Sequence, residues 1–538
     1  MPTAPVDSPD TPGAPGPARL GALGIVTLLV AAAIFGGVTL LSPFGRDQGN
    51  YAYSAWEWLH GRMLYSGVFV FKPPMTSLVH AFAQVLFGAS MTSIRVLDVG
   101  WTALTALVTA RCSAHLFRHR LSALAAGLLV PAFQFLPGWW GTAQTDGWMG
   151  LPCLLALLLI LEGGGGTARS VAYLAGTLVG VAMLFKYVAA AFVLGLIVAS
   201  FPVRSSGPRS VLLTLGVGAL GLMTPLMLCA AWLATNGAMD AFLDCQFSLV
   251  PGYVTGTGRP GLAYGMSSLL RWLTGDPRFH CVVIALPGLI LAVARLARGH
   301  RGCGVALAWL GAGLASYLSQ GKYFDYHLLA LVPGLALVGG LGIGWGLDHV
   351  YTFIPTPSLQ RGLTLGLLLL APGLTPYPRS FGIAAQILRG DRTLEEYWHT
   401  DPAFVLPDYA LPEVLGVARW LREHTGPEDR VFVWGFEPTI QFVAQRDTVS
   451  RFLYNYPFAA VWAGEARYGA ELLAELRASP PRYIVVGSRD ATPYVTGNRL
   501  DSRALFLAFE ELRLFVEDGY QPAGRLGRYT FFQPTPSP

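Results

Sequence analysis

Residues 20–41, LGALGIVTLLVAAAIFGGVTLL, decide the class of fold to which this chain belongs. The segment carries no charged side chain, and as a helix it is long enough to cross the roughly 30 Å hydrocarbon core of a bilayer. A polar stretch, SPFGRDQGNY at residues 42–51, follows it directly. We therefore interpret residues 20–41 as a transmembrane helix that ends beside a polar loop.

More apolar segments of similar length follow, so the sequence predicts a polytopic α-helical membrane protein with about eleven transmembrane helices. The further segments lie near residues 93–114, 120–137, 147–162, 169–185, 187–203, 210–235, 279–298, 303–319, 326–347 and 361–376. The apolar segment 75–88 is shorter, and we interpret it as a re-entrant or interfacial helix.

The composition agrees with a membrane protein and excludes other classes. Of the 538 residues, 53% are hydrophobic and 13% are charged, which is about half the charged fraction of a typical soluble domain. No run of basic residues suggests nucleic-acid binding. The 6 cysteines are scattered between Cys112 and Cys303, without the spacing of a disulfide framework or a metal site.

The arginines of the short loops predict the orientation in the membrane. With the N-terminus in the cytoplasm, every short cytoplasmic loop contains at least one arginine. These residues are Arg111, Arg118, Arg120, Arg169, Arg204, Arg209, Arg295, Arg298, Arg301 and Arg361. The loops at 42–92 and 236–278, and everything after residue 376, are then extracytoplasmic.

Four regions follow from this interpretation. Residues 1–19, rich in Pro, Ala and Gly, are expected to form a disordered cytoplasmic tail, and residues 20–376 a transmembrane domain whose first outer loop is 42–92. Residues 377–394 form a linker, and residues 395–538 an extracytoplasmic α/β domain, because strand-like and helix-like runs alternate there. The strand-like runs are 431–434, 483–486 and 529–532, and the helix-like runs are 413–423, 470–478 and 503–515.

Lysine is rare in this chain, and its placement is informative. Of the 37 basic residues only Lys72, Lys186 and Lys322 are lysines. All three fall at the extracytoplasmic ends of predicted spans, the side that the orientation rule disfavours. Separate anchors whose side chains reach the interface are the alternative, but three isolated lysines at similar depth favour an anion site.

The loop after the first span carries the first candidate catalytic residue. Asp47 follows the span closely in an aromatic neighbourhood. A partly desolvated carboxylate at the membrane–water boundary can accept a proton from an acceptor hydroxyl. The same residue also suits the N-cap of a helix over residues 50–60, and position alone does not separate the two interpretations.

Other polar residues stand at the outer ends of later spans. Asp146, in the sequence QTDG, is a second candidate catalytic carboxylate that could orient the substrate or bind a metal ion, with capping of a helix that begins at Gly147 as the alternative. Tyr323, Tyr326 and His327 follow Lys322 at the start of a span and are candidate substrate-binding residues. In the predicted outer domain only Glu437, in WGFEP, stands out as a residue to test.

On these residues the chain resembles the integral-membrane GT-C glycosyltransferases, specifically the members of glycosyltransferase family 39 type related to protein O-mannosyltransferases and to the lipid A aminoarabinose transferase. The resemblance covers most of residues 20–376. It rests on Asp47 followed by Tyr51, on Lys-Pro-Pro at 72–74, on Thr145-Asp146, on Lys186 in GVAMLFKYV, and on the aromatic stretch 322–327.

The resemblance implies a GT-C-like catalytic domain that moves a sugar, a hexose or a pentose, from a polyprenyl-phosphate donor to a lipid, glycan or protein acceptor. The site is expected on the outer face of the bacterial cytoplasmic membrane, among membrane lipids. Asp47 matches the residue that activates the acceptor, Asp146 a second acidic position, and Lys72 the lysine that holds the donor phosphate. We add Lys186, Lys322, Arg46 and Tyr51 as candidate donor-phosphate contacts.

Two departures from the family pattern concern metal binding. Gln48 and Asn50 occupy positions where several relatives have a glutamate and an arginine, and Phe71 stands where an acidic residue often precedes the lysine. These differences weaken the transfer of a metal site to this chain. We therefore assign no metal ligand and no cofactor, although a divalent metal ion stays open.

Two other functions stay open at this level. A transporter or flippase of an anionic lipid or a lipid-linked sugar would use the lysines as a passage, but such proteins have two-sided access and usually repeated halves. Here the polar residues gather on one predicted side. A ligase that uses a diphosphate-linked glycan is the other alternative.

Overall fold

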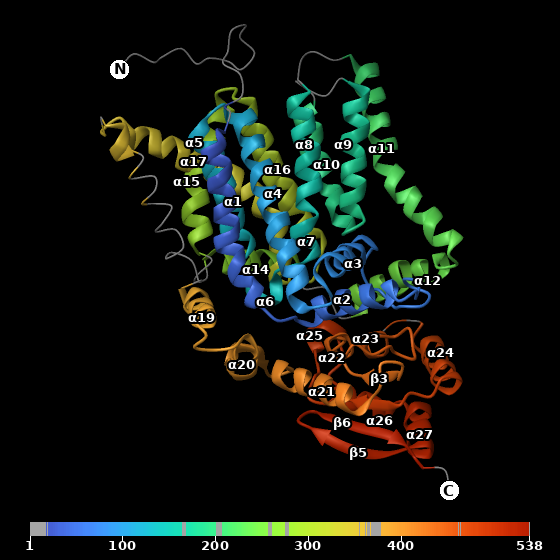
Figure 1. Cartoon of the computed structure of the whole chain (residues 1–538). Helices are drawn as coiled ribbons and strands as arrows, with labels where there is room; N and C mark the ends of the chain where they lie inside the picture. The colour runs from blue at the N-terminus through green and yellow to red at the C-terminus, as the bar shows by residue number, and fades with distance from the viewer. Residues whose placement is uncertain are drawn as a thin grey trace. The chain divides into compact units, whose positions relative to one another are not determined.

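A computed structural model describes residues 18, 20–163, 168–200, 207–256, 261–274, 279–354, 356–360, 362, 366, 378–460, 462 and 464–536. The chain divides into two compact units (Figure 1). Unit 1 comprises Met1–Ser42, Arg95–Leu228 and Pro260–Ala385, and unit 2 comprises Pro43–Ile94, Cys229–Arg259 and Gln386–Pro538. The predicted cytoplasmic tail, apart from residue 18, and the predicted span at 361–376, apart from residues 362 and 366, lie outside the described residues.

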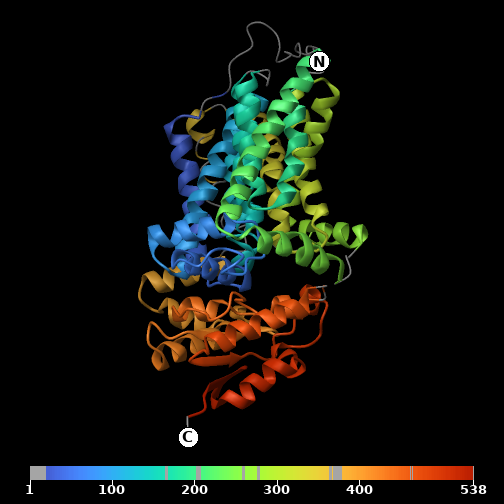
Figure 2. The same ribbon diagram turned by 90° about the vertical axis from the view of Figure 1, so that its right-hand side faces the viewer.

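Unit 1 is helical, and its long helices run roughly alongside one another (Figure 2). They are α1 (Ala22–Gly37), η1 (Val38–Leu41), α4 (Met91–Phe117), α5 (Arg120–Gln134), α6 (Gly138–Gly141), α7 (Thr145–Trp148), α8 (Gly150–Glu162), α9 (Arg169–Met183), η2 (Tyr187–Ala191), α10 (Phe192–Ser200), α11 (Pro208–Thr235), α14 (Leu262–Thr274), α15 (Phe279–Ala297), α16 (Arg301–Ser319), η4 (Asp325–Leu331), α17 (Val332–Tyr351) and part of α19 (Pro378–Leu388).

Among the described residues, 6 helical segments are long and apolar enough to cross a membrane. They are Ala22–Leu41, Met91–Phe117, Thr145–Glu162, Pro208–Thr235, Arg301–Ser319 and Asp325–Tyr351. The shorter apolar helices are Met75–Phe87, Arg120–Gln134, Arg169–Met183, Tyr187–Ser200 and Ile284–Ala297. Helices therefore occupy every predicted span except the one outside the described residues. The count of eleven stays a prediction, because several of these helices are shorter than a usual span.

Glycines allow the helices of unit 1 to approach closely. A Cβ atom on Gly288 of α15 would lie 1.8 Å from the carbonyl oxygen of Val338 on α17, and one on Gly342 of α17 would lie 2.6 Å from the nitrogen of Gly288. Between α9 and α11, a Cβ atom on Gly176 would lie 2.0 Å from the carbonyl oxygen of Gly218. Close backbone contact of this kind stabilises helix association in lipid, where burying apolar side chains adds little.

Unit 2 combines three stretches of the chain. The first loop forms α2 (Arg46–Leu59) and α3 (Met75–Phe87), and the second stretch forms α12 (Met239–Asp244), η3 (Cys245–Leu249) and α13 (Val250–Gly256). The C-terminal stretch forms α20 (Leu394–Thr400), η6 (Pro402–Phe404), β1 (Val405–Leu406), β2 (Tyr409–Ala410), α21 (Leu411–His424), β3 (Val431–Trp434), α22 (Thr439–Ala444), α23 (Tyr456–Ala459), α24 (Glu465–Ala478), β4 (Tyr483–Val486), α25 (Pro493–Thr496), α26 (Ser502–Ala508), α27 (Glu510–Gly519), β5 (Tyr520–Leu526) and β6 (Tyr529–Pro534).

The main sheet of unit 2 has the strand order β3-β4-β6-β5. Strands β3 and β4 are parallel, and β6 is antiparallel to both β4 and β5. Every side chain of β3 and β4 is buried, which explains why these short apolar runs were predictable as strands. The predicted strand at 529–532 is confirmed within β6. Strand β5 was not predicted, because its sequence YQPAGRL contains a proline and a glycine, which are rare inside strands.

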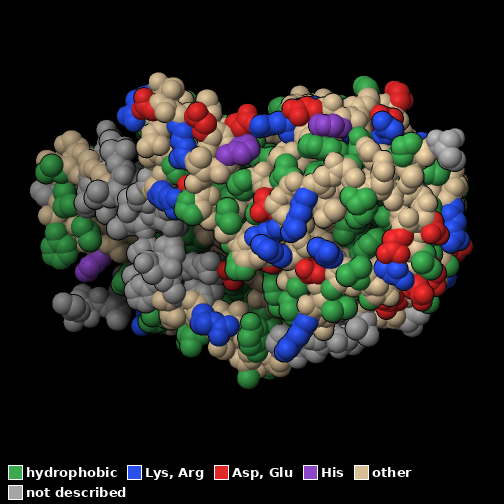
Figure 3. Space-filling view, turned by 90° about the horizontal axis from the view of Figure 1, so that it is seen from below, with side chains coloured by type: hydrophobic (Ala, Val, Ile, Leu, Met, Phe, Trp, Pro, Cys, Tyr) green, Lys and Arg blue, Asp and Glu red, His purple; other side chains and the backbone are tan. Residues whose placement is uncertain are grey.

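The first outer loop packs with the C-terminal stretch inside unit 2. The hydroxyl of Tyr53 on α2 donates to the carbonyl oxygen of Arg446 at 2.8 Å, and the backbone N–H of Thr448 donates to Glu57 Oε1 at 3.1 Å. The sequence-based division placed loop 42–92 with the transmembrane domain, because it follows chain order and cannot see such contacts. On the face of the molecule drawn in Figure 3, acidic and basic side chains are intermingled with apolar ones, as on water-exposed surfaces.

Candidate functional site

Asp146 lies at the start of a helical stretch in unit 1. It occupies the first turn of α7, whose N-cap residue is Gln144. The alternative interpretation of Asp146 as a helix cap is therefore wrong. Its side chain is fully buried, so its charge requires partners within the protein.

A lysine and a glutamine supply those partners. Lys186 Nζ lies 2.7 Å from Asp146 Oδ2, and Gln320 Nε2 donates to Asp146 Oδ1 at 2.8 Å. Lys186 Nζ also donates to Gln320 Oε1, so each of the three side chains contacts the other two. Lys186 precedes η2 and Gln320 ends α16, so the triad forms where several helices of unit 1 end.

This arrangement keeps a positive charge in a place where water has little access. The side chain of Lys186 is 14% exposed and that of Asp146 is 0% exposed. A buried ammonium group is stable only beside an opposite charge and further acceptors, and here it has both. The aromatic ring of Tyr326 lies 5.7 Å from Lys186 Nζ, within the range of a cation–π interaction.

Arg95 and Asp98, two buried charged residues of α4, hydrogen-bond to the segment 139–148 that contains Asp146. Arg95 Nη1 donates to Thr142 Oγ1 at 2.6 Å, and its Nη2 donates to the carbonyl oxygen of Trp139 at 2.9 Å. Asp98 accepts from the backbone N–H of Ala143 at 3.0 Å and from Trp148 Nε1 at 2.8 Å. Because these partners lie on both sides of Asp146 in the chain, Arg95 and Asp98 fix the path of the backbone through it.

The aromatic stretch after Lys322 divides between two places in unit 1. Tyr326 lies beside Lys186, and its ring packs edge-on against His327 with centroids 4.7 Å apart. Tyr323 has a left-handed backbone, with φ 55°, and packs against Tyr317 and Tyr264, with ring centroids 5.3 and 6.3 Å apart.

Lys322 itself lies in the turn between α16 and η4 and is buried. Burial lowers the pKa of its ammonium group to about 8, because desolvation disfavours the charged form. The ammonium group is therefore still mostly protonated at neutral pH. Because burial has removed part of its hydration, a nearby anion would stabilise its charged form.

In unit 2, Asp47 lies in the first turn of α2 and is half-buried. The helix begins at Arg46 with Gly45 as its N-cap, and the Gly45 N–H donates to Gln48 Oε1 at 3.0 Å. The alternative interpretation of Asp47 as the N-cap of a helix over residues 50–60 is therefore wrong. A carboxylate at the second helical position still interacts favourably with the positive end of the helix dipole.

Two other predicted residues of unit 2 occupy the neighbourhood of α2 and α3. Tyr51 is buried, and its ring lies edge-on to His80 with centroids 5.7 Å apart. Lys72 is half-buried in front of α3, and its carbonyl oxygen accepts from the hydroxyl of Tyr65 at 2.8 Å. This backbone contact fixes the position of Lys72 in the loop.

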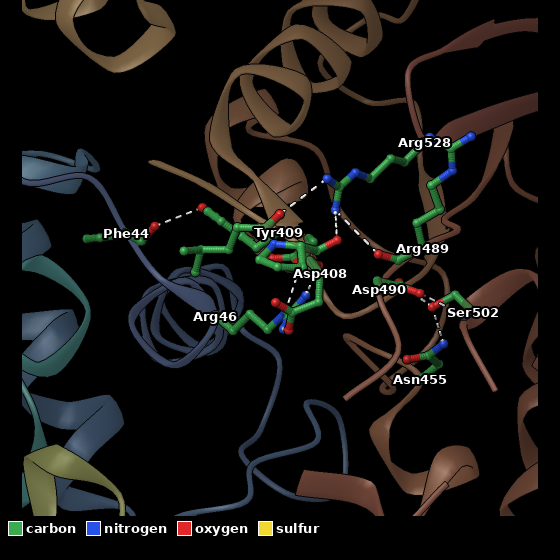
Figure 4. A network of polar contacts seen from close by, with 12 residues as sticks. Phe44, Arg46, Asp408, Tyr409, Asn455, Arg489, Asp490, Ser502 and Arg528 are labelled. Carbon is green, nitrogen blue, oxygen red and sulfur yellow. Dashed lines mark hydrogen bonds and ion pairs between the residues drawn. The ribbon is translucent and has the colours of Figure 1, made fainter. Parts of the chain in front are cut away.

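Arg46 has a different environment from the predicted one. Its Nη1 atom lies 2.7 Å from Asp408 Oδ2 (Figure 4). Its Nε atom lies 2.7 Å from Glu437 Oε1. Two carboxylates therefore neutralise this guanidinium within unit 2, which argues against its predicted contact with a donor phosphate. Burial raises the pKa of the Glu437 carboxyl to about 7, although the positive charge of Arg46 opposes this shift.

The part of the chain that the structure describes contains no group of three or more His, Cys, Asp or Glu side chains placed to hold a metal ion. The predicted residues fall into two sets, with Asp146, Lys186, Lys322, Tyr323, Tyr326 and His327 in unit 1 and Arg46, Asp47, Tyr51 and Lys72 in unit 2.

Comparison with solved structures identifies the architecture. The chain superposes on ArnT from Cupriavidus metallidurans bound to undecaprenyl phosphate with a TM-score of 0.61 and 16% identity, covering 95% of this chain and 98% of ArnT. The apo state of the same protein gives a TM-score of 0.60 and 17% identity over the same shares. The chain has the fold of a GT-C glycosyltransferase. This fold confirms the resemblance inferred from the sequence.

Sequence comparison points to the same GT-C group. Residues 71–234 match the family model described as dolichyl-phosphate-mannose-protein mannosyltransferase, a stretch that contains Lys72, Asp146 and Lys186. The chain is 28% identical over 345 residues to the undecaprenyl phosphate-alpha-4-amino-4-deoxy-L-arabinose arabinosyl transferase of Pseudomonas paraeruginosa. The match to the enzyme of the same name from Pseudomonas aeruginosa is also 28% identical, over 349 residues. These matches cover 60% of this chain and 58% of the length of each relative.

Sequence reasoning missed several residues of these sites. Gln320 carries no signal in the sequence, because a single glutamine after an apolar helix is common. Arg95 and Asp98 lie three positions apart within an apolar helix, and their contacts with residues 139–148 require the fold. Asp408 stands in the mostly apolar stretch FVLPDYA, where nothing in the sequence distinguishes it. Glu437 was singled out, but without its partner Arg46.

Proposed function

We propose that this chain is a membrane glycosyltransferase that transfers a sugar from a polyprenyl-phosphate donor to an acceptor on the outer face of the bacterial cytoplasmic membrane. The observation that carries the proposal is the buried triad of Lys186, Asp146 and Gln320 at the ends of apolar helices. A lysine held in this way at the end of its helix can still donate a hydrogen bond to a lipid phosphate. The GT-C fold and the names of the relatives agree with this donor class.

The reaction requires one base and one anion site. The acceptor hydroxyl attacks the anomeric carbon of the sugar, the bond from this carbon to the phosphate oxygen breaks, and the polyprenyl phosphate leaves with the electron pair. We assign the acceptor proton to Asp47, which makes inversion at the sugar carbon the simplest outcome. Fixed positive charge stabilises the departing phosphate in the transition state.

Lysines are the natural source of that charge. We assign Lys72, Lys186 and Lys322 to the donor phosphate, as the sequence predicts, and we assign Asp146 to keeping Lys186 in place. Tyr51 is proposed to line the donor site, and Tyr323, Tyr326 and His327 to contact the substrates. The sugar, whether hexose or pentose, and the acceptor, whether lipid, glycan or protein, depend on contacts beyond these residues.

We infer the orientation of the protein in the membrane from the arginines of its short loops. The N-terminus is placed in the cytoplasm, and the lysines and the C-terminal α/β domain outside it. Attachment of a membrane-impermeant thiol reagent to single cysteines introduced at exposed positions tests this arrangement. The reagent is expected to label Tyr494→Cys in intact cells. It is expected to label Arg298→Cys only after the cells are permeabilised, which would place the arginine-containing loops in the cytoplasm.

Donor class is tested with the purified full-length protein. Radiolabelled sugar linked to undecaprenyl monophosphate is expected to transfer to a membrane extract, and the same sugar linked to undecaprenyl diphosphate is not. Transfer from the diphosphate alone would favour a ligase instead. Movement of either lipid across a vesicle bilayer without transfer would favour a flippase.

The assignment of Asp47 is tested by Asp47→Asn. This change removes the base but keeps the size of the side chain, so transfer is expected to fall at least 100-fold while donor binding persists. Asp391→Asn, at an exposed residue paired with Arg389, is the matched control and is expected to retain full transfer. Undiminished transfer by Asp47→Asn would overturn the assignment.

A further inference from the structure

Helix α2, which begins at Arg46 and carries Asp47, is held along its length by the C-terminal stretch of unit 2. At its start, the hydroxyl of Tyr409 donates to the carbonyl oxygen of Phe44 at 2.9 Å (Figure 4). In its middle, Gly49 packs so closely that a Cβ atom there would lie 3.1 Å from the backbone nitrogen of Thr439. Near its end, Glu57 accepts from the backbone N–H of Thr448.

The strongest contact at the start of α2 is made by Arg46. Its guanidinium reaches Glu437 through Nε and Asp408 through Nη1, both at 2.7 Å, and its Nη2 donates to the carbonyl oxygen of Asp408. The rings of Tyr409 and Phe436 lie 5.7 and 5.8 Å from its central carbon. Three donating nitrogens are thus engaged in fixed directions, which only the planar fork of arginine allows.

The place of this contact in the fold is also informative. Glu437 follows β3, the strand that runs parallel to β4. Open α/β sheets usually bind their ligands at the carboxyl ends of parallel strands. In unit 2, the Arg46 side chain from the first loop lies beside this edge. Nearby, the backbone N–H and the hydroxyl of Ser502 donate to Asp490 at 2.8 and 2.5 Å (Figure 4).

We propose that Asp408 and Glu437 are positioning residues of the transfer reaction, because they bind Arg46 and thereby fix the first turn of α2 on which Asp47 stands. The proposal rests on the proposed function, in which Asp47 accepts the proton. It gives the C-terminal α/β domain a part in catalysis through its contact with Arg46.

The physical reason is the adjacency of Arg46 and Asp47 in the chain. Their α-carbons are joined by one peptide unit, so a guanidinium held at three atoms restricts the rotation and the starting point of the helix. Proton transfer requires the base within hydrogen-bond reach of the acceptor hydroxyl. A displacement of about 1 Å in such a geometry lowers a rate by on the order of 100-fold.

The test uses Glu437→Gln and Arg46→Lys in the full-length protein. Glutamine keeps the size of the side chain but removes its charge, and lysine keeps the charge of Arg46 but cannot reach both carboxylates. Each variant is expected to lower kcat at least tenfold at pH 8, with KM for the monophosphate-linked donor within twofold of the unsubstituted value. The matched control is Asp490→Asn, which removes a neighbouring buried carboxylate that hydrogen-bonds Ser502 instead of Arg46; it is expected to keep kcat within twofold.

Hydrogen exchange provides a readout that does not depend on activity. Backbone amides of residues 44–50 are expected to exchange at least tenfold faster in Glu437→Gln and in Arg46→Lys, with amides of α3 and β4 unchanged. Unaltered exchange and unaltered kcat in both folded variants would overturn the proposal, as would an equal loss of kcat in Asp490→Asn. If Glu437→Gln does not fold, Arg46→Lys alone decides.

The two proposals fail in distinguishable ways. If the unsubstituted protein transfers no sugar from any polyprenyl-phosphate donor, the proposed function fails, and positioning of Asp47 for transfer fails with it whatever the exchange rates are. If the unsubstituted protein transfers sugar and Asp47→Asn abolishes it, but the two positioning variants retain full kcat, only the present inference is overturned.

Discussion

The Nζ atom of Lys186 lies 2.7 Å from the Oδ2 atom of Asp146, although the two residues are 40 positions apart in the chain. The pair joins the start of α7 to the turn after α9, and Gln320 connects it to the end of α16. A single buried ion pair thus connects three helical segments of unit 1. This makes it important for stability as well as for the proposed donor site.

Removing one partner of this pair should destabilise the protein more than removing both. Asp146→Leu leaves the Lys186 ammonium without its counter-charge, and breaking a buried pair in this way costs about 3–5 kcal/mol. The double variant Asp146→Leu/Lys186→Met leaves no unpaired charge and is expected to recover at least half of that loss. Thermal unfolding in detergent micelles measures both values. A double variant as unstable as the sum of the single variants would contradict this account.

Asp98 is expected to affect sugar transfer, because it holds the segment of the chain that contains Asp146. Asp98→Asn replaces one of two accepting oxygens with an NH₂ group, which must then face either the Ala143 N–H or the indole N–H of Trp148. An unsatisfied buried donor costs about 1–3 kcal/mol, and the freed segment should also lower kcat. Thermal unfolding and the transfer assay measure the two effects. Asp348→Asn, the same change at an exposed residue beside His119, should alter neither.

The sequence predicted the apolar helices because each needs a long run of uncharged residues. Residues 301–319, for example, form one helix, close to the predicted segment 303–319. The same reasoning failed for the outer loop at 42–92. Its assignment to unit 2 depends on contacts such as that between Tyr53 and Arg446, which join residues far apart in the chain and leave no periodic pattern.

For the site, the type of residue was more predictable than its partner. The rarity of lysine singled out Lys186 and Lys322, and the structure shows that both are buried or nearly so. By contrast, Arg46 was assigned to phosphate as a further positive charge beside the lysines. Its partners Asp408 and Glu437 lie 362 and 391 positions later in the chain. Over such a distance, sequence patterns carry no information on which residues pair.

The raised pKa of Glu437 makes a pH-dependent contribution to stability. Burial raises this pKa from its ordinary value of 4.5 to about 7, with Asp490 and Asp408 adding to the shift and Arg46 opposing it. Between pH 4.5 and about pH 7, the folded protein therefore keeps a proton on Glu437 that the unfolded chain has already released. The resulting stability is fully present below pH 4.5 and is lost as the pH rises to about 7.

Glu437→Gln should abolish that contribution. Between pH 5 and pH 7 the free energy of unfolding of the unsubstituted protein is expected to fall relative to that of the variant by up to about 1.4 kcal/mol per pH unit. Unfolding temperatures of both proteins over this range measure the difference, with Glu413→Gln as a less buried control. Parallel curves for the unsubstituted protein and Glu437→Gln would show that the carboxyl group titrates near its ordinary pKa.

The contact between α15 and α17 predicts opposite outcomes for two glycines one turn apart. A Cβ atom on Gly342 would lie 2.6 and 2.7 Å from the nitrogen and α-carbon of Gly288, whereas a Cβ atom on Gly346 would meet nothing within 4 Å. Gly342→Ala must therefore push the helices apart, because backbone atoms cannot move aside as a flexible side chain can, and a loss of about 1–3 kcal/mol is expected. Gly346→Ala should be neutral or stabilising by up to about 1 kcal/mol, because alanine favours the helix. Thermal unfolding of the two variants in the same detergent decides the matter, and equal unfolding temperatures would contradict close backbone packing at Gly288.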